Sequence, residues 1–318
     1  MLTRLTVVST LQRENMRPFK EAFEAENPDI RLTMRTLGNG TVTDALMAQA
    51  EVADGIDVIW GLSAASMILL RDAGLLLPYT PSGAERVEVR FKDARVPAAW
   101  VGGGIWTTAL CAATGLGDRL PAAWSDLTHP SWRGRIAMPS PVSSGVGMAL
   151  VGGWLLSMGE ERAWAFMDAL HENMVVYTQE GSKACRMVST GAIDIGLSFD
   201  YRATHTKAQT KAVVPVFPDG LGWDVSAAAI LTTTKNADAA RRFADWSASD
   251  RARRFYADAL DFSMVASGEV NRELPDLPPD LAKRLAPMDF TWLAANRERI
   301  IATWIKRYGT KMEAPAAE

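Results

Sequence analysis

Apolar and polar positions repeat along this chain in two periods, one typical of strands and one of helices. Short β-branched runs predict strands, and apolar residues three or four apart predict helices. Repeated strand and helix units predict a mainly parallel sheet with helices on both faces. In the N-terminal third, the predicted strands are 5–9, 30–35 and 57–60, and the predicted helices are 15–26, 43–51 and 63–72.

A second series of the same kind follows a proline-bearing surface segment at 77–97 and an apolar segment at 105–112. Its predicted strands are 135–138, 174–178, 193–199, 213–217 and 225–231, and its predicted helices are 122–127, 144–158, 160–172 and 182–190. The rest of the chain is predicted to be helical, apart from a loop at 274–280.

Because one series lies inside the other, we expect two interleaved α/β domains. Domain 1 would comprise 1–105 and 226–318, domain 2 would comprise 106–225, and the chain would cross near 104–107 and 224–227. In such a fold the strand ends of both domains face a common cleft, which is where open α/β sheets bind ligands.

Composition narrows the class of protein. The chain has 318 residues, of which 48% are hydrophobic and 22% charged, as in soluble globular proteins. A net charge of −3 with no basic block disfavours nucleic acid and anionic membrane surfaces as partners. No apolar run reaches the roughly 20 residues of a bilayer span. The N-terminus lacks the pattern of a signal peptide, so we expect a cytoplasmic protein or one whose leader has been removed.

Candidate chemistry is sparse. The three histidines stand at no ligand spacing, so no metal site and no cofactor are predicted. The two cysteines, Cys111 and Cys185, are either buried thiols or a disulfide, and the sequence leaves both possibilities open. No nucleophile elbow, phosphate loop or zinc-protease motif occurs, so no catalytic residue is assigned and a protein that only binds is favoured.

The most informative stretch is 138–148, where a predicted strand leads through Ser143, Ser144 and Gly145 into an apolar helix. The first amides of a helix have no carbonyl partner and lie at the positive end of its dipole. With two hydroxyls beside them, these amides could bind an anion. The alternative interpretation is a serine that only caps the helix.

Four further turns between a strand and a helix carry small polar residues. Taken singly, each is typical of a cap or a turn. Five such turns in one chain together favour a ligand-binding edge. The other four are Ser9 with Thr10, residues 38–41, residues 61–63 including Ser63, and residues 181–183.

Two clusters place a carboxylate beside an aromatic ring at the end of a predicted strand. Asp200 and Tyr201 follow one strand, and Trp223 and Asp224 precede another. A carboxylate neutralises an ammonium group, and a ring face adds about 0.5 to 2 kcal/mol. The alternative is a capped turn with a buried ring.

Eight strings along nearly the whole chain resemble the substrate-binding proteins of ABC importers, in the branch that includes ferric-ion and 2-aminoethylphosphonate binders. The similarity is greatest to the aminoethylphosphonate group. The strings are FEAENPDIRL, DVIWGLSAAS, DAGLLLPYTP, WSDLTHPSWRGRIAMPSPVSSGVG, MDALHENMVVYTQEGSKAC, IGLSFDYRA, GLGWDVSAAAI and KNADAARRFADWSAS.

The resemblance implies an α/β fold of the periplasmic-binding-protein type II, with two domains, a ligand cleft between them and a hinge of two strands. It also implies a mature periplasmic protein whose export signal has been removed, a monomer that delivers a small molecule to a membrane permease. The ferric branch uses adjacent tyrosines as ligands, whereas this chain has Asp200 followed by Tyr201. One phenolate cannot reproduce that site, so iron is disfavoured.

We therefore expect a binder of 2-aminoethylphosphonate or a close aminophosphonate. The phosphonate would be held by Ser143, Ser144 and Gly145, with Ser9, Thr10 and Ser63 facing it and Arg202 able to pair with it. Asp200 is the first choice to bind the amine, then Asp224, then Glu180. The alternatives are a polyamine, thiamine, phosphate or ferric-ion binder, or an enzyme acting on a phosphorylated amine.

Overall fold

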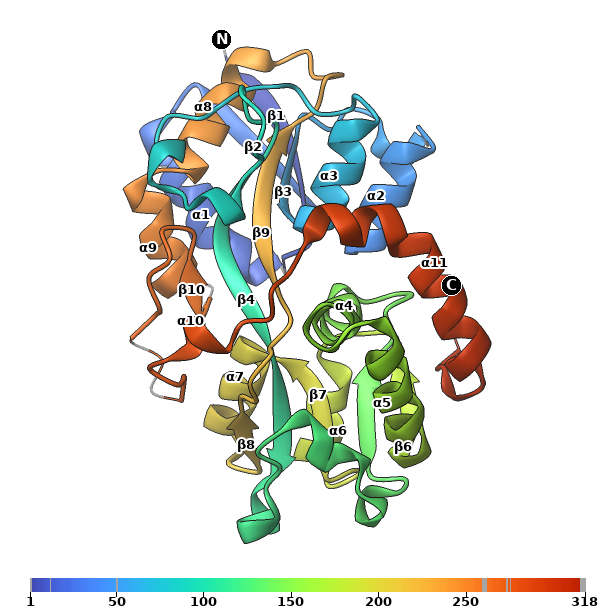
Figure 1. Ribbon diagram of the computed structural model, residues 1–318. Helices are drawn as coiled ribbons and strands as arrows, with labels where there is room; N and C mark the ends of the chain where they lie inside the picture. Colours follow the sequence, from blue (N-terminus) through green and yellow to red (C-terminus); the bar gives the residue numbers. More distant parts are fainter. Residues whose placement is uncertain are drawn as a thin grey trace. The chain divides into compact units, whose positions relative to one another are not determined.

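The computed structural model describes residues 2–11, 13–49, 51–258, 262–272, 274 and 276–314. The chain divides into two compact units (Figure 1). Unit 1 consists of 1–105 and 224–273, and unit 2 consists of 106–223 and 274–318.

Unit 1 is built on a sheet in the order β2-β1-β3-β9, in which β1 is parallel to β2 and β3, and β9 is antiparallel to β3. A short strand, β10, pairs with the first part of β4. These strands are β1 (Thr3–Ser9), β2 (Ile30–Thr36), β3 (Val58–Leu62), β4 (Val101–Ala113), β9 (Trp223–Ile230) and β10 (Met264–Val265). The helices are α1 (Arg13–Glu26), α2 (Asn39–Met47), α3 (Ala64–Asp72), α8 (Ala237–Ser247) and α9 (Asp250–Asp258).

An aromatic cluster fills the core of unit 1. Phe19 packs against Trp60 with ring centroids 4.6 Å apart, and Trp60 Nε1 donates to the Tyr256 hydroxyl at 2.7 Å. The glycine run at the start of β4 is required by this cluster. A Cβ on Gly103 would stand 2.1 Å from the Tyr256 ring, so the strand approaches the ring only because it has no side chain there.

Unit 2 has a second sheet in the order β4-β7-β5-β6, in which β5 is parallel to β6 and β7. The second part of β4 is antiparallel to β7 and to β8. The additional strands are β5 (Ile136–Pro139), β6 (Met174–Thr178), β7 (Ile195–Phe199) and β8 (Val213–Val216). The helices are α4 (Gly145–Met158), α5 (Glu160–Asn173), α6 (Lys183–Ser189), α7 (Asp200–Thr210), α10 (Leu281–Arg284) and α11 (Phe290–Tyr308).

Short 3-10 helices connect these elements. One of them, Trp124–Thr128, takes the place of the helix expected at 122–127. The others are Glu51–Ala53, Ala84–Arg86, Val89–Phe91, Thr114–Arg119, Pro130–Trp132 and Gly309–Lys311.

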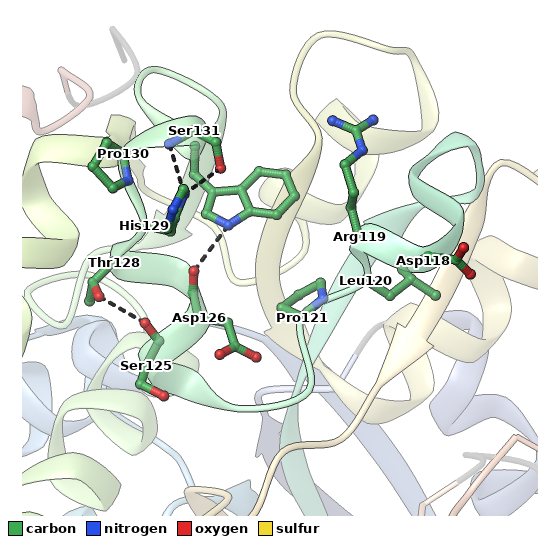
Figure 2. A pocket seen from close by; sticks show the side chains of 11 residues that line it. Asp118, Arg119, Leu120, Pro121, Ser125, Asp126, Thr128, His129, Pro130 and Ser131 are labelled. Atoms are coloured by element: carbon green, nitrogen blue, oxygen red, sulfur yellow. Dashed lines mark hydrogen bonds between the residues drawn. The ribbon is translucent and has the colours of Figure 1, made fainter.

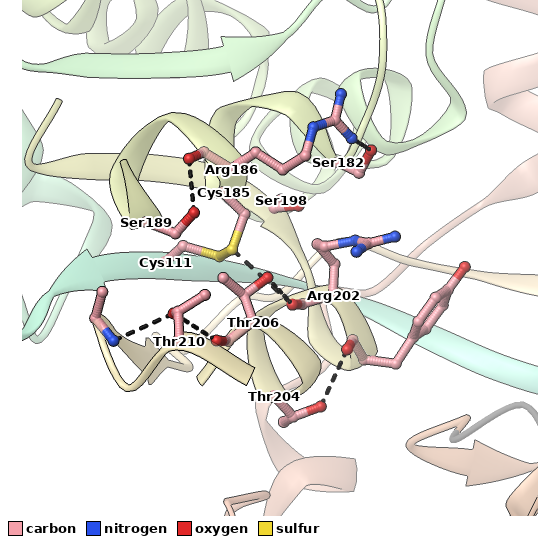
Figure 3. Close-up of a disulfide and its surroundings, with 12 residues drawn as sticks. Cys111, Ser182, Cys185, Arg186, Ser189, Ser198, Arg202, Thr204, Thr206 and Thr210 are labelled. Atoms are coloured by element: carbon pink, nitrogen blue, oxygen red, sulfur yellow. Dashed lines mark hydrogen bonds between the residues drawn. A yellow bond between two sulfur atoms is a disulfide. The ribbon is translucent and has the colours of Figure 1, made fainter. Parts of the chain in front are cut away.

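A disulfide joins Cys111 on β4 to Cys185 on α6, with the Cα atoms 5.3 Å apart (Figure 3). The sequence left buried thiols and a disulfide as alternatives, and the structure has the disulfide. Its loop spans 74 residues. Cross-linking a loop of this length stabilises a fold by about 4 kcal/mol in the chain-entropy account.

The C-terminal segment belongs to unit 2, whereas we expected all of 226–318 in domain 1. The reason lies in what α11 packs against. The Trp304 ring lies edge-on to Tyr177 of β6 at 4.9 Å, and the Tyr308 hydroxyl donates to Asp168 of α5 at 2.8 Å. The chain therefore passes between the units a third time, at 273/274, in addition to the passages at 105/106 and 223/224.

Two elements were not predicted. Residues 200–210 form α7, although the threonine-rich sequence has low helix propensity. Its threonines are satisfied within the helix, since Thr206 Oγ1 donates to Arg202 O at 2.8 Å and Thr210 Oγ1 to Thr206 O at 2.7 Å. The prediction that the rest of the chain is helical was also wrong at Met264–Val265. These two residues form β10, which pairs with β4 in the sheet of unit 1.

Candidate functional site

Three turns gather at one edge of the sheet in unit 2. Strands β5, β6 and β7 run parallel, and each is followed by the first turn of a helix, α4, α6 or α7. Carboxyl ends of parallel strands meet at one edge, where α/β sheets commonly bind ligands. We call residues 140–147, 179–183 and 200–202 the unit 2 edge. The predicted residues that lie on it are Ser143, Ser144, Gly145, Asp200, Tyr201 and Arg202.

Ser144 precedes α4 in extended backbone geometry (φ −120°, ψ 129°), the position of an N-cap, yet its side chain makes no capping hydrogen bond. Its carbonyl accepts from Met148 N at 3.0 Å, so the helix is hydrogen-bonded from this residue onward. The hydroxyl of Ser144 and the first amides of α4 are therefore together at the positive end of the helix. Amides and a hydroxyl in this position are able to donate to an anion.

The turn after β6 packs against this helix start. Ser143 is exposed, and its Oγ donates to Gln179 O at 3.0 Å. A Cβ on Gly181 would stand 3.2 Å from Ser144 Oγ, which shows how closely the two turns approach each other. The turn is also fixed from β7, because Ser198 Oγ donates to Gly181 O at 2.7 Å.

Arg202 lies in the first turn of α7. Its Nε is buried and has no hydrogen-bond partner among the described residues, and its guanidinium is paired with no described carboxylate. Its carbonyl lies 4.0 Å from Cys185 Sγ, and Figure 3 shows its guanidinium extending away from the disulfide. The buried Nε is an unsatisfied donor, and a bound anion could accept from it.

Asp200 ties the start of α7 to β4. It is fully buried, its Oδ2 accepts from Thr107 N at 2.7 Å, and its Oδ1 accepts from Tyr201 N at 2.7 Å. The Tyr201 ring packs on Phe199 with centroids 4.4 Å apart. Burial, with a smaller contribution from the charge of Asp200, raises the pKa of the Tyr201 phenol above its usual range. Both oxygens of Asp200 thus have partners within unit 2.

Ser9, Thr10 and Ser63 lie at the carboxyl ends of β1 and β3 in unit 1, and their side chains bind neighbouring backbone. Ser9 Oγ accepts from Leu11 N at 3.1 Å, and Thr10 Oγ1 donates to Gly61 O. Ser63 caps α3, since its Oγ accepts from Ser66 N at 3.3 Å.

Asn39 is a member of this group that sequence reasoning missed. Its Oδ1 accepts from Ser63 N at 3.0 Å, and its Nδ2 donates to Ser66 Oγ at 3.0 Å. The signal was present in the turn at 38–41, where an asparagine opens a helix. With Ser9, Thr10, Ser63 and Asp224 it forms what we call the unit 1 edge.

Asp224 is the first residue of β9 that belongs to unit 1, and it is buried at 7% exposure. Its Oδ1 accepts from Ala64 N at 2.8 Å and from Val225 N at 2.7 Å. No hydrogen bond of its Oδ2 is present among the described residues. Burial raises the pKa of this carboxyl to about 7, although the two backbone hydrogen bonds act in the opposite direction.

Trp223, the neighbour of Asp224, belongs to unit 2 and is 3% exposed. Its Nε1 donates to Ala286 O at 2.8 Å, and its ring is perpendicular to that of Phe290 at 5.0 Å. These contacts are those of a core residue that anchors the C-terminal segment.

Cavities formed by other residues lie within single units. One of about 540 Å³ in unit 2 lies under the loops at 118–132, where His129 Nδ1 is 2.8 Å from Ser131 Oγ (Figure 2). Another, of about 650 Å³, lies in unit 1 beside Asp57 and Asn236. Neither is lined by a predicted site residue.

The part of the chain that the structure describes contains no group of three or more His, Cys, Asp or Glu side chains arranged to hold a metal ion. Within the same residues, every helix is too short or too polar to cross a bilayer.

Comparison with known proteins identifies the class. Residues 10–254 match the family of bacterial extracellular solute-binding proteins. The chain belongs to this family. A probable ABC transporter periplasmic-binding protein of Sinorhizobium fredii, y4fP, is 28% identical over 315 residues, which cover 93% of this chain and 80% of that protein.

Two solved structures share the fold. The periplasmic binding protein AfuA from Actinobacillus pleuropneumoniae, with fructose-6-phosphate bound, has a TM-score of 0.83 at 22% identity, covering 96% of this chain and 99% of that one. Iron-bound HitA from Pseudomonas aeruginosa has a TM-score of 0.78 at 20% identity, covering 94% and 99%. The predicted fold class, α/β of the periplasmic-binding-protein type II, is confirmed.

The family assigns the chain to the extracellular or periplasmic solute-binding proteins of ABC transporters, so a small-molecule ligand and a membrane permease are its partners.

Proposed function

We propose that this protein binds a small organic phosphonate or phosphate for import, with 2-aminoethylphosphonate as the leading candidate. One observation carries the proposal. At the unit 2 edge, the side chain of Ser144 makes no capping hydrogen bond to α4, and the buried Nε of Arg202 has no hydrogen-bond partner among the described residues.

The anionic group is assigned to these donors. A tetrahedral phosphonate has three oxygens and accepts hydrogen bonds from several directions, which suits two hydroxyls, helix amides and a guanidinium. The bound phosphate sugar of AfuA is consistent with such chemistry in this fold. We propose that Ser144 and Gly145 donate to the phosphonate, that Ser143 joins them by turning its proton from Gln179 O to the ligand, and that Arg202 neutralises the anion.

The ammonium group is assigned to Asp224 rather than to our first choice, Asp200. Both oxygens of Asp200 are occupied by backbone amides and the residue is fully buried. Asp224 has one oxygen held by the amides of Ala64 and Val225, and Oδ2 remains to accept from a ligand. Glu180 is less suitable because it is exposed and pairs with Arg186 at 2.6 Å.

Isothermal titration calorimetry against a panel of solutes tests the proposal. The panel contains 2-aminoethylphosphonate, ethylphosphonate, fructose 6-phosphate, inorganic phosphate, putrescine, thiamine and ferric citrate. We expect the strongest binding by 2-aminoethylphosphonate, weaker binding by ethylphosphonate and none by putrescine. Binding of putrescine or thiamine without any phosphonate would contradict the proposal.

The same samples separate a binder from an enzyme that acts on a phosphorylated amine. A binder is stabilised thermally by its ligand and returns it unchanged. Phosphorus NMR of the mixture after prolonged incubation should therefore show only the starting phosphonate. Release of inorganic phosphate would favour the enzyme.

A further inference from the structure

The last described residues of the chain, Lys311–Ala314, pass beside β6, and one of them, Glu313, contacts the unit 2 edge. Met312 forms a parallel bridge with Tyr177 of β6, and Glu313 N donates to Tyr177 O at 2.9 Å. We call residues 311–314 the C-terminal strap. It lies beside β6, the last strand in the sheet order of unit 2.

Glu313 is the member of the strap that reaches the turn after β6. Its Oε2 accepts from Gln179 N at 3.0 Å, its carbonyl accepts from Gln179 Nε2 at 2.7 Å, and its Oε1 pairs with Lys183 Nζ. The hydrogen bonds from Lys183 and Gln179 lower the pKa of this carboxyl below its usual range. Glu313 is therefore ionised at neutral pH and holds both ends of the turn.

Gln179 connects Glu313 to the anion-binding residues. Its amide N–H and side chain bind Glu313, while its carbonyl accepts from Ser143 Oγ at 3.0 Å. Two residues further on, a Cβ on Gly181 would stand 3.2 Å from Ser144 Oγ, so the space between them admits no side chain. The turn thus has Glu313 on one side and both serines of the unit 2 edge on the other.

We infer that Glu313 is a positioning residue for the anion site, acting through Gln179 on Ser143 and through Gly181 on Ser144. This inference rests on the proposed function. A binding residue must be held within a fraction of an ångström of its productive position, and supporting hydrogen bonds from a neighbouring element provide that precision. Glu313 supplies this support from a segment more than 130 residues away in the sequence.

Lys311 offers a matched control within the same strap. Its Nζ donates to His171 O at 2.6 Å and to Met174 O at 2.9 Å, so it fastens the strap to the end of α5. It makes no hydrogen bond to residues 179–183. Removing Lys311 weakens the attachment of the strap without removing the bonds to Gln179.

The test compares Glu313→Ala, Glu313→Gln and Lys311→Met by calorimetry with 2-aminoethylphosphonate and with inorganic phosphate, alongside thermal unfolding. Glu313→Ala should bind about five- to tenfold more weakly than the parent. Glu313→Gln keeps an acceptor for the Gln179 amide, so it should remain within about threefold of the parent. Lys311→Met should lower the melting temperature but bind within about twofold of the parent.

Equal affinities of Glu313→Ala and the parent would overturn the inference, as would equal losses in Glu313→Ala and Lys311→Met. Hydrogen exchange without ligand gives a second readout that does not depend on the solute. Glu313→Ala should speed exchange in 179–183 and 143–147, whereas Lys311→Met should not. A parent that binds neither probe would defeat the proposed function, and unchanged exchange in Glu313→Ala would defeat the positioning role.

Discussion

Ser63 and Ser144 have the same place in their respective units, and their side chains do different things. Each follows a strand and precedes the first residue of a helix in extended backbone geometry. Ser63 Oγ accepts from Ser66 N and closes the start of α3, whereas Ser144 makes no capping hydrogen bond. A serine before a helix therefore marks a possible anion site, and its hydrogen bonds decide whether it is one.

The difference extends to the residues around each serine. At the unit 1 edge, Ser9, Thr10 and Asn39 bind backbone or side chains of the same unit. At the unit 2 edge, Arg202 Nε is buried without a partner among the described residues. Donors that a protein leaves unsatisfied in a buried position are expected to be satisfied by a ligand. This contrast is the reason for assigning the anionic group to unit 2.

The largest expected effect concerns the disulfide beneath the unit 2 edge. Replacing both Cys111 and Cys185 by alanine should lower the free energy of unfolding by about 4 kcal/mol, because a cross-linked loop of this length is released. Urea unfolding of the oxidised parent and of the variant measures it. A loss below about 1 kcal/mol would contradict the chain-entropy account of this disulfide.

Arg202→Met should weaken phosphonate binding by tenfold to a hundredfold, since a hydrogen bond to a charged group contributes about 1.5 to 3 kcal/mol. Arg202→Lys should recover part of the loss, because it keeps the charge but not the two parallel donors of a guanidinium. Calorimetry with 2-aminoethylphosphonate measures both variants. If Arg202→Met binds the phosphonate as tightly as the parent does, the guanidinium is not part of the site.

Asp224 should make amine recognition depend on pH. With a pKa of about 7, the carboxyl is mostly neutral below pH 7, and an ammonium group binds its ionised form. The affinity for 2-aminoethylphosphonate relative to ethylphosphonate should therefore rise about tenfold between pH 6 and pH 8, and level off above it.

Asp224→Asn is the matched control for this pH dependence, because its amide oxygen can still accept from Ala64 N. In this variant the affinity ratio should be low and constant with pH. If the affinity ratio rises with pH in Asp224→Asn as it does in the parent, a group other than Asp224 causes the pH dependence.

The smallest effect is expected for Ser63→Ala. Losing the cap of α3 should lower the free energy of unfolding by about 1 kcal/mol. Because Ser63 caps α3 and is not assigned to the anion, we expect a smaller change in phosphonate affinity than in stability. A large loss of affinity with unchanged stability would reverse the contrast between the two serines.

Sequence patterns predicted most strands well because their apolar, β-branched runs are buried, as in β6 and β7, where the boundaries agree within two residues. They failed at α7, whose threonines favour extended backbone in isolation and are accommodated by hydrogen bonds to carbonyls of the helix. Local pattern also could not place α11, since its position is decided by Tyr177 and Asp168, far away in the sequence.

For the site, the strand-to-helix turn at 143–145 and the strand end at 199–202 were predicted from the sequence, and parallel strands bring both to one edge. Their hydrogen bonds depend on neighbours that a local motif does not contain. Two interactions were found only in the tertiary structure: the hydrogen bond from Ser143 Oγ to Gln179 O and the one from Gln179 N to Glu313 Oε2. The hydrogen bond from Thr107 N to Asp200 Oδ2 was likewise found only in the tertiary structure. It is one reason why we propose Asp224 rather than Asp200 as the partner of an amine.

The affinity of the double variant Ser143→Ala/Ser144→Ala for 2-aminoethylphosphonate tests the assignment of the anionic group most directly. Calorimetry of the variant and the parent should show a loss of about tenfold or more for each hydroxyl, with an unchanged melting temperature in the absence of ligand. Parent-like affinity in the double variant would contradict the account and would leave Ser144, like Ser63, with a purely structural role.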